Sequence, residues 1–362
     1  MRLTHAIGLS LLTACGARSG IQESAEGGDP ARGGTRWADC DPGTLQSKAI
    51  GTMDWRNMRH VASPKDRLVF AGNAGLRVVN TLNGTIDEVA LTGWIALPDR
   101  DTTFSGPDCI AIRGNSLYVT DNLGNVYVTS LSAGSAELTV VYSVTNVATT
   151  LSNSSACVTL LATKDLVYLL RRDQTLLTIR GNSVTEETGI TAIAIAGEQF
   201  FYTTNQRLFS RRASQPSTSQ RVVNVGGIER YVLVGAEGNF AYLLSHLDSP
   251  TLARVNTEPN SVGSETVWPL PGDLCDDYCV WNISDEGLVV SSATGQLWGA
   301  PVGANAAQLS MLAAFPGYDA DDFSPALTSD ATHIYWFASP TSDESDLTLY
   351  ATSCFNEGMM SQ

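Results

Sequence analysis

The segment Asn115-Ser-Leu-Tyr-Val-Thr-Asp-Asn-Leu-Gly-Asn-Val-Tyr-Val-Thr129 contains two short runs of apolar residues on either side of a turn sequence. Within each run, apolar and polar residues alternate, which is the period of a half-buried β-strand. Asp, Asn and Gly between the runs are residues that favour tight turns. The segment therefore predicts a β-hairpin.

The same hairpin pattern recurs along the chain. Clear copies cover 66–80 and 165–179, and weaker copies begin near Gly197, Gly238, Glu286 and Ala331. A period of about 40 to 50 residues with several short strands per unit is typical of a propeller blade. Equivalent anchor positions lie 34 to 50 residues apart, at Val69, Tyr118, Tyr168, Tyr202, Tyr242, Val289 and Tyr335. The sequence predicts an all-β protein, a β-propeller of seven blades, with six blades as the alternative if the short Tyr202 unit is truncated.

The ends of the repeat predict how the ring closes. The second blade can be drawn as strands 109–113, 116–121, 124–131 and 137–144, and the same template fits from Cys157, Tyr231 and Tyr278. The last unit has strands at 332–338 and 346–352 but lacks an outer strand. Leu45 to Met53 has no blade of its own, so we expect it to supply that strand. Such closure removes open sheet edges.

Parts of the repeat resemble the NHL and YWTD propeller families. The resemblance is carried by Leu117-Tyr-Val-Thr-Asp121 with Asn125-Val-Tyr, and by His333-Ile-Tyr-Trp-Phe337. The copies at Ala241-Tyr-Leu-Leu and Leu288-Val-Val-Ser keep the apolar pattern and lose the aspartate. The whole chain also resembles propeller lipoproteins of the bacterial outer membrane, some of which are assembly scaffolds. This likeness transfers no functional residue.

The N-terminal residues predict the cellular location of the protein. Arg2 precedes the apolar run Ala6 to Leu12, a pattern typical of a secretory signal. Leu12-Thr13-Ala14-Cys15 resembles a bacterial lipobox, which implies cleavage before Cys15 and lipidation of its sulfur. Because Gly16 follows the cysteine, the resemblance also implies a location at the outer membrane or cell surface. The alternative is a chance cysteine in an ordinary signal peptide. Residues 1–14 are then the signal peptide, 15–36 the lipidated cysteine with a glycine-rich flexible tether, and 37–362 the propeller domain.

Six further cysteines predict three disulfides in an oxidising compartment. Their number allows 15 pairings, and the repeat orders them. Ring closure would bring Cys40 beside Cys354, and equivalent positions in adjacent blades would bring Cys109 beside Cys157. The local pair Cys275–Cys279 remains. These pairings are expectations from the arrangement of blades.

Composition and motifs exclude several classes of function. Charged residues are 16% of the chain and the formal net charge is −15, so nucleic acid is an unfavourable partner. The sequence contains no G-x-S-x-G, G-x-G-x-x-G or P-loop motif. His60, His246 and His333 lie in no zinc-binding spacing. We expect no cofactor, with calcium as the one alternative.

The calcium candidate is Asp319, Asp321 and Asp322, in the loop before the last blade, where carboxylates at i, i+2 and i+3 could converge on one ion. Similar acidic clusters lie at 273–277 and 343–346. The alternative interpretation of all three clusters is solvated acidic turns on an acidic protein.

The segment from Thr92 to Asp108 is the longest insertion between blades, and it predicts a partner-binding loop through Trp94, Arg100 and Phe104. The alternative is that Trp94 packs against the first blade.

Two functions of different class are compatible with these patterns. The first is a membrane-anchored binding or scaffold protein of the cell envelope that engages a protein or glycan. The second is an exported propeller enzyme, a lyase or hydrolase acting on a glycan or lactone, which would need convergent acidic, histidine or arginine side chains at the channel mouth.

Overall fold

The computed structural model describes 20 segments of the chain, and all structural statements below concern them. They are residues 35–53, 58–62, 67–72, 75–81, 83–94, 107–131, 135–144, 157–204, 207–215, 221–223, 231–245, 251–257, 265–270, 279–284, 286–292, 296–301, 309–314, 327–330, 332–338 and 347–354. Within these segments, no helix has the length and apolar character needed to cross a bilayer.

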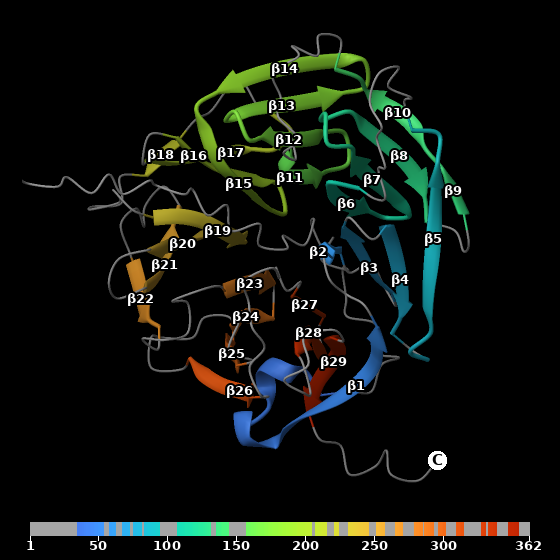
Figure 1. Ribbon diagram of the computed structural model, residues 1–362. Helices are drawn as coiled ribbons and strands as arrows, with labels where there is room; N and C mark the ends of the chain where they lie inside the picture. Colours follow the sequence, from blue (N-terminus) through green and yellow to red (C-terminus); the bar gives the residue numbers. More distant parts are fainter. Residues whose placement is uncertain are drawn as a thin grey trace, which may run out of the picture.

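Seven antiparallel sheets are arranged as blades around a common centre, as Figure 1 shows. Blades I to III are built, from the innermost strand outwards, of β2 (Met58–Ala62), β3 (Arg67–Gly72), β4 (Gly75–Asn80) and β5 (Ile86–Thr92); β6 (Cys109–Arg113), β7 (Ser116–Thr120), β8 (Val126–Ser130) and β10 (Thr139–Tyr142); and β11 (Cys157–Ala162), β12 (Val167–Arg171), β13 (Thr175–Arg180) and β14 (Ser183–Thr188). Blades IV to VI are built of β15 (Ile190–Ala196), β16 (Gln199–Thr204), β17 (Arg207–Arg212) and β18 (Arg221–Val223); β19 (Tyr231–Glu237), β20 (Phe240–Ser245), β21 (Thr251–Asn256) and β22 (Glu265–Pro269); and β23 (Cys279–Ser284), β24 (Gly287–Ser292), β25 (Gln296–Pro301) and β26 (Ser310–Ala314). Blade VII is built of β27 (Thr328–Ser329), β28 (His333–Ala338), β29 (Leu347–Cys354) and β1 (Leu45–Met53). The prediction of a seven-bladed β-propeller is confirmed.

The six-blade alternative is wrong because blade IV has four strands of its own. The unit is short in sequence for a local reason. Gly189, with a φ of 80°, is the single residue between β14 and β15, whereas other blades are joined by longer segments. A positive φ suits glycine, which lets the chain reverse there in one residue.

The ring closes through the N-terminal strand, as predicted. β1 pairs antiparallel with β29, from Leu45 opposite Cys354 to Met53 opposite Leu347. The outer strand of blade VII therefore comes from the opposite end of the chain from its other three strands.

One detail of blade II differs from the prediction. The expected strand 137–144 is divided, and a separate strand β9 (Ser135–Glu137) joins β5 of blade I in parallel, with Leu91 opposite Ala136. Ala136 and Leu138 are buried in the cluster between blades I and II. Burial of these side chains explains why the chain crosses to blade I before it forms β10.

The hydrophobic core lies between the blades. Separate clusters of buried residues fill the interfaces of blades I–II, II–III, III–IV, IV–V and V–VI, and one larger cluster joins blades VI, VII and I. Phe70 of blade I and Phe337 of blade VII make an edge-to-face contact at 5.3 Å across the last of these. Each blade is therefore stabilised by both of its neighbours.

Candidate functional site

The order of strands gives the disc two different faces. In each blade the second and fourth strands run in one direction and the first and third in the other, because all four are antiparallel neighbours. One face, here called the loop face, carries the starts of β6, β11 and β15 and the turn 172–174. The opposite face, here called the closure face, carries the turns 114–115 and 181–182, Glu286, Asp330 and the end of β29 at Cys354.

The N-terminal segment is fastened to the closure face. A short 3-10 helix η1 (Trp37–Asp39) is followed by a second, η2 (Pro42–Thr44), which leads into β1. The indole of Trp37 is 2% exposed and belongs to the cluster that joins blades VI, VII and I. The segment that precedes β1 therefore contributes to the core and contacts a second blade.

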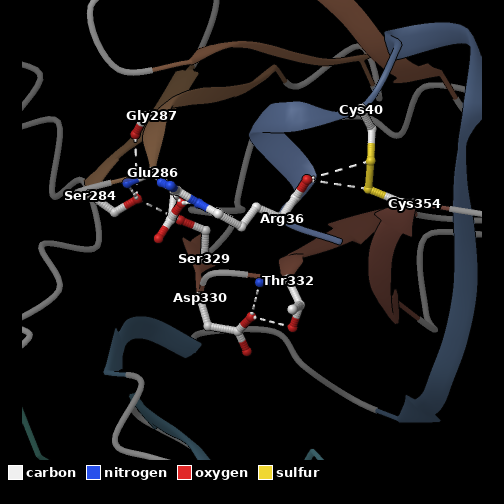
Figure 2. Close-up of polar contacts among 9 residues, drawn as sticks. All are labelled: Arg36, Cys40, Ser284, Glu286, Gly287, Ser329, Asp330, Thr332 and Cys354. Carbon is white, nitrogen blue, oxygen red and sulfur yellow. Dashed lines mark hydrogen bonds and ion pairs between the residues drawn. A yellow bond between two sulfur atoms is a disulfide. The ribbon is translucent and has the colours of Figure 1, made fainter. Parts of the chain in front are cut away.

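Polar contacts surround the place where the N-terminal segment meets blades VI and VII (Figure 2). We call this place the closure seam; it consists of Arg36, Cys40, Ser284, Glu286, Ser329 and Cys354. Arg36 forms an ion pair with Glu286 of the β23–β24 turn. The carbonyl oxygen of Arg36 lies 3.4 Å from Sγ of Cys40 and 3.3 Å from Sγ of Cys354. Arg36, just before η1, is thus held to blade VI by an ion pair, and Cys40, just after η1, is held to blade VII by the disulfide.

Blades VI and VII also meet through a buried pair of hydroxyls. Oγ of Ser284 lies 3.2 Å from Oγ of Ser329, and the backbone N–H of Glu286 donates to the Ser284 hydroxyl at 3.3 Å. The hydroxyl pair orders the turn that carries Glu286. The seam is therefore a structural site that holds Arg36 on the closure face.

Asp330 organises the neighbouring turn of blade VII. Its Oδ1 accepts from the backbone N–H groups of Thr332 and His333, both at 2.8 Å, and its Oδ2 accepts from the Tyr335 hydroxyl at 3.0 Å. Burial acts to raise the pKa of this carboxyl, but hydrogen bonds from His333 and Thr332 outweigh it and lower the pKa to about 2. Oγ1 of Thr332 and Nδ1 of His333 are 2.8 Å apart. This Asp, Thr and His set caps a turn, and the same ring nitrogen of His333 faces both partners, which is not the geometry of a catalytic triad.

Two of the three predicted cysteine pairs lie within the described residues, and they occupy opposite faces. Cys40 and Cys354 form a disulfide at the closure seam, with their Cα atoms 6.0 Å apart. Cys109 and Cys157 form a second at the starts of β6 and β11 on the loop face, with a Cα–Cα distance of 6.1 Å. Cys279 begins β23, and the predicted pair Cys275–Cys279 falls outside the description because Cys275 does. Disulfides of this kind are typical of exported proteins.

The aspartate of the hairpin motif has a structural role. Oδ1 of Asp121 accepts from the backbone N–H groups of Leu123 at 3.0 Å and Asn125 at 2.9 Å, and its Oδ2 accepts from the Tyr127 hydroxyl at 2.9 Å. The side chain is 8% exposed. These hydrogen bonds hold the β7–β8 turn in a fixed conformation.

The predicted partner-binding loop is described only at its start. Trp94 packs edge-to-face against Tyr127 of β8 at 5.1 Å and contacts the cluster between blades I and II. This contact agrees with the packing alternative, although the partner is blade II as well as blade I. Arg100 and Phe104 lie outside the described residues.

Cys15 and the calcium candidates Asp319, Asp321 and Asp322 also lie outside the described residues. Among the residues that the structure does describe, no group of three His, Cys, Asp or Glu side chains could hold a metal ion.

A buried arginine lies between blades III and IV. The Arg211 guanidinium lies 4.9 Å from the centroid of Phe200 and 5.0 Å from that of Tyr202. Its two terminal nitrogens donate to the Glu187 carboxylate at 2.8 and 2.6 Å. Aromatic faces and a bidentate carboxylate together stabilise this cation.

A second arginine lies between aromatic rings at the interface of blades V and VI. The Arg254 guanidinium is 4.9 Å from the centroid of Phe240 and 5.4 Å from that of Trp268. We call Phe240, Arg254 and Trp268 the Arg254 cradle. The sequence analysis did not predict this cluster. The one signal in the sequence is that the paired strands place an aromatic residue, Tyr242, opposite Arg254.

Comparison with known proteins identifies a fold and no family. No protein-family profile matches the chain, and no curated protein does. By contrast, 928 chains of solved structures match, so the fold is a common one.

Three of the matching structures illustrate how different the proteins are that match this chain. BamB from Moraxella catarrhalis is 13% identical over 82% of this chain and 83% of its own, with a TM-score of 0.45. PorZ of Porphyromonas gingivalis is 12% identical over 86% of this chain and 39% of its own, with a TM-score of 0.54. The WD40 propeller domain of Doa1 is 10% identical over 84% of this chain and 97% of its own, with a TM-score of 0.56. This chain shares the β-propeller fold with the Doa1 domain.

Proposed function

We propose that the protein is a lipid-anchored binding or scaffold protein of the bacterial cell envelope. In this proposal Cys15 carries the lipid, residues 16–36 form the tether, and the propeller engages an envelope protein or glycan at the outer membrane or cell surface. PorZ, described as an essential bacterial surface component of the type-IX secretion system, is an example of a propeller protein at a bacterial surface.

The observation that carries the proposal is the position of Arg36. It is fastened to the closure face by Glu286 and lies against the Cys40–Cys354 disulfide. A tether that leaves from Arg36 would turn the closure face towards the membrane. The loop face, with Trp94 and the turn 172–174, would then point away from the membrane towards a partner.

The rigidity of the disc supports the same function. Among the described residues, each face carries one disulfide, and β1 fills the place of the outer strand in blade VII. A covalently closed disc presents its loops in a fixed arrangement, which lowers the entropy lost on binding.

The test is photo-crosslinking in intact cells of the native host. A photoreactive residue replaces Asp173, exposed on the loop face, or Asn182, exposed on the closure face. We expect one dominant envelope partner from position 173 and none from position 182. A parallel Cys15→Ala variant should leave the membrane fraction.

Each contrary result has a meaning. Equal crosslinking from both faces contradicts the proposed orientation, and retention of Cys15→Ala in the membrane contradicts the lipid anchor. If neither position yields a product above background, the binding role is wrong, and glycan or lactone turnover should be assayed instead.

A further inference from the structure

The outermost strand of a propeller blade has one edge that its own sheet leaves unpaired. Such an edge presents N–H and C=O groups to any extended chain, so the sheets of natural proteins usually carry features that hinder pairing there. In blade I the edge is covered by the chain itself, because β9 adds to β5 in parallel. The outer edge of a blade in this protein can therefore accept a further strand.

Five other blades have outer strands with features that hinder strand addition. Strands β1, β10 and β26 each contain an extra residue at which the register shifts, and a bulge of this kind bends an edge and interrupts its ladder. Strand β18 has only three residues. Strand β22 ends in Pro269, whose backbone nitrogen carries no hydrogen to donate. Pairing with any of these five strands would be short or interrupted.

Strand β14 of blade III has none of these features. Its six residues, Ser183 to Thr188, pair with β13 without a register shift and include no proline or glycine. Figure 1 shows β14 at the outer rim of the disc, and among the described residues no strand pairs with its outer side. All of its residues except Glu187 are exposed. It is the most regular outer edge in the described part of the ring.

The hairpin of β13 and β14 determines which backbone groups face outwards. Its turn consists of residues 181–182, and a two-residue turn is closed by a hydrogen-bonded pair, which places Ser183 in such a pair. Hydrogen-bonded pairs recur at every second residue of an antiparallel ladder. The N–H and C=O groups of Glu186 and Thr188 therefore point away from β13.

The charges on β14 favour one kind of partner. Glu187 is paired with Arg211, whereas Glu186 is exposed. Pairing of two copies of β14 would bring their carboxylates together, and like charges on paired strands are destabilising. In addition, a chain with a net charge of −15 repels its own copies and attracts cationic segments. A basic strand is thus favoured over a second copy of this chain.

We propose that β14 pairs, over Thr185 to Thr188, with an extended basic segment of a partner protein. This inference rests on the proposed binding function and names the chemistry of the partner. This half of β14 lies nearest the loop face, because the strand runs from the turn 181–182 on the closure face towards the start of β15. Asn182 lies three residues before it, about 10 Å away along the strand. A partner that approaches the loop face can therefore reach the outward groups of Glu186 and Thr188.

The test uses the full, disulfide-intact protein and labelled hexapeptides in fluorescence polarisation. The probe is Thr-Val-Lys-Val-Lys-Thr, and its charge control is Thr-Val-Glu-Val-Glu-Thr. We expect the basic probe to bind roughly tenfold more tightly than the control, since attraction to Glu186 is replaced by repulsion. Hydrogen exchange gives a second readout, in which the amide hydrogens of Glu186 and Thr188 should exchange more slowly with the basic probe bound.

Two substitutions separate charge from backbone pairing. Glu186→Lys should weaken binding of the basic probe roughly tenfold. Thr188→Pro removes an outward N–H without changing the charge, and should also weaken binding roughly tenfold; an edge strand tolerates proline where its N–H faces solvent. Glu198→Lys makes the same charge change at an exposed turn of blade IV and should leave the affinity unchanged. Thermal unfolding of each variant verifies that it is folded.

Three results would overturn the proposal. The first is binding of the basic probe that is unchanged in Glu186→Lys and Thr188→Pro, and the second is equal binding of the two peptides. The third is dimerisation of the protein alone that Thr188→Pro abolishes in analytical ultracentrifugation, which would assign the edge to a second copy.

Failure of this inference is distinguishable from failure of the proposed function. The peptide assay needs neither the lipid nor a cell, so a wrong anchor or orientation would leave its outcome unaffected. Conversely, a cellular partner crosslinked at position 173 and recovered equally from Glu186→Lys would support the binding function and refute the role of β14.

Discussion

The indole of Trp37 lies on the backbone of Gly287, and a Cβ atom at position 287 would come within 2.7 Å of Cη2 of Trp37. The same Cβ would also collide with the carbonyl oxygen of Ala300 on β25. The absence of a side chain at the start of β24 therefore allows the N-terminal segment to dock on blade VI. This contact joins residues 250 positions apart in the sequence.

Replacing Gly287 with alanine should open the closure seam. The added methyl clashes with a backbone atom that cannot rotate away, so we expect a loss of about 1–3 kcal/mol in the free energy of unfolding. Urea denaturation followed by tryptophan fluorescence measures it. Gly238→Ala is the matched control, because a Cβ there meets nothing within 4 Å, although its φ of 52° adds a modest strain. A loss in Gly287→Ala no larger than the loss in Gly238→Ala would contradict a steric requirement for glycine beneath Trp37.

Removing the Cys40–Cys354 disulfide should destabilise the protein more than removing Cys109–Cys157. The first spans 314 residues of sequence and the second 48, so the first restricts the unfolded chain more. The chain-entropy relation gives a difference of about 1.5 kcal/mol at 25 °C. Double alanine variants of each pair, compared by urea denaturation, measure the difference. A larger loss for Cys109–Cys157 would mean that packing of these two buried residues outweighs loop closure.

Repetition explains what could be predicted from the sequence. Recurrent hairpins predicted a propeller of seven blades, with six left open by the short Tyr202 unit, and the leftover segment before the first blade predicted β1 as the closing strand. Features that depend on how neighbouring blades meet have no periodic signal. Strand β9 is three residues long, Trp37 is a single aromatic residue, and the pairing of Arg254 with Phe240 and Trp268 arises across strands of a folded blade. None of these can be inferred from spacing alone.

Protonation of Asp330 should destabilise blade VII in acid. Its pKa is lowered from 3.8 to about 2 in the folded protein, so the stabilisation is complete above the unfolded value and is lost as the pH falls through the folded value. The contribution at neutral pH is about 2 kcal/mol. Asp330→Asn should therefore lower stability at pH 7 and flatten its decline between about pH 4 and pH 2. Asp165→Asn, an exposed aspartate in a turn of blade III, should keep the slope of the unsubstituted protein. An unchanged slope in Asp330→Asn would assign the acid sensitivity to other carboxylates.

The buried side-chain amide of Asn282, between blades VI and VII, should destabilise the folded protein. Asn282 on β23 is 3% exposed, and within the described residues neither its Nδ2 nor its Oδ1 has a hydrogen-bond partner. Its neighbour across the β23–β24 ladder is Val289, which is part of the large apolar cluster. Desolvation of an unpaired amide opposes folding, so Asn282→Leu, which keeps the branched shape, should raise the free energy of unfolding by about 1–2 kcal/mol. Urea denaturation at neutral pH measures the change, and Asn115→Leu on the exposed β6–β7 turn serves as control. A loss of stability in Asn282→Leu would instead show that the amide binds an ordered water in the interface, since displacing such a water leaves its other partners unsatisfied.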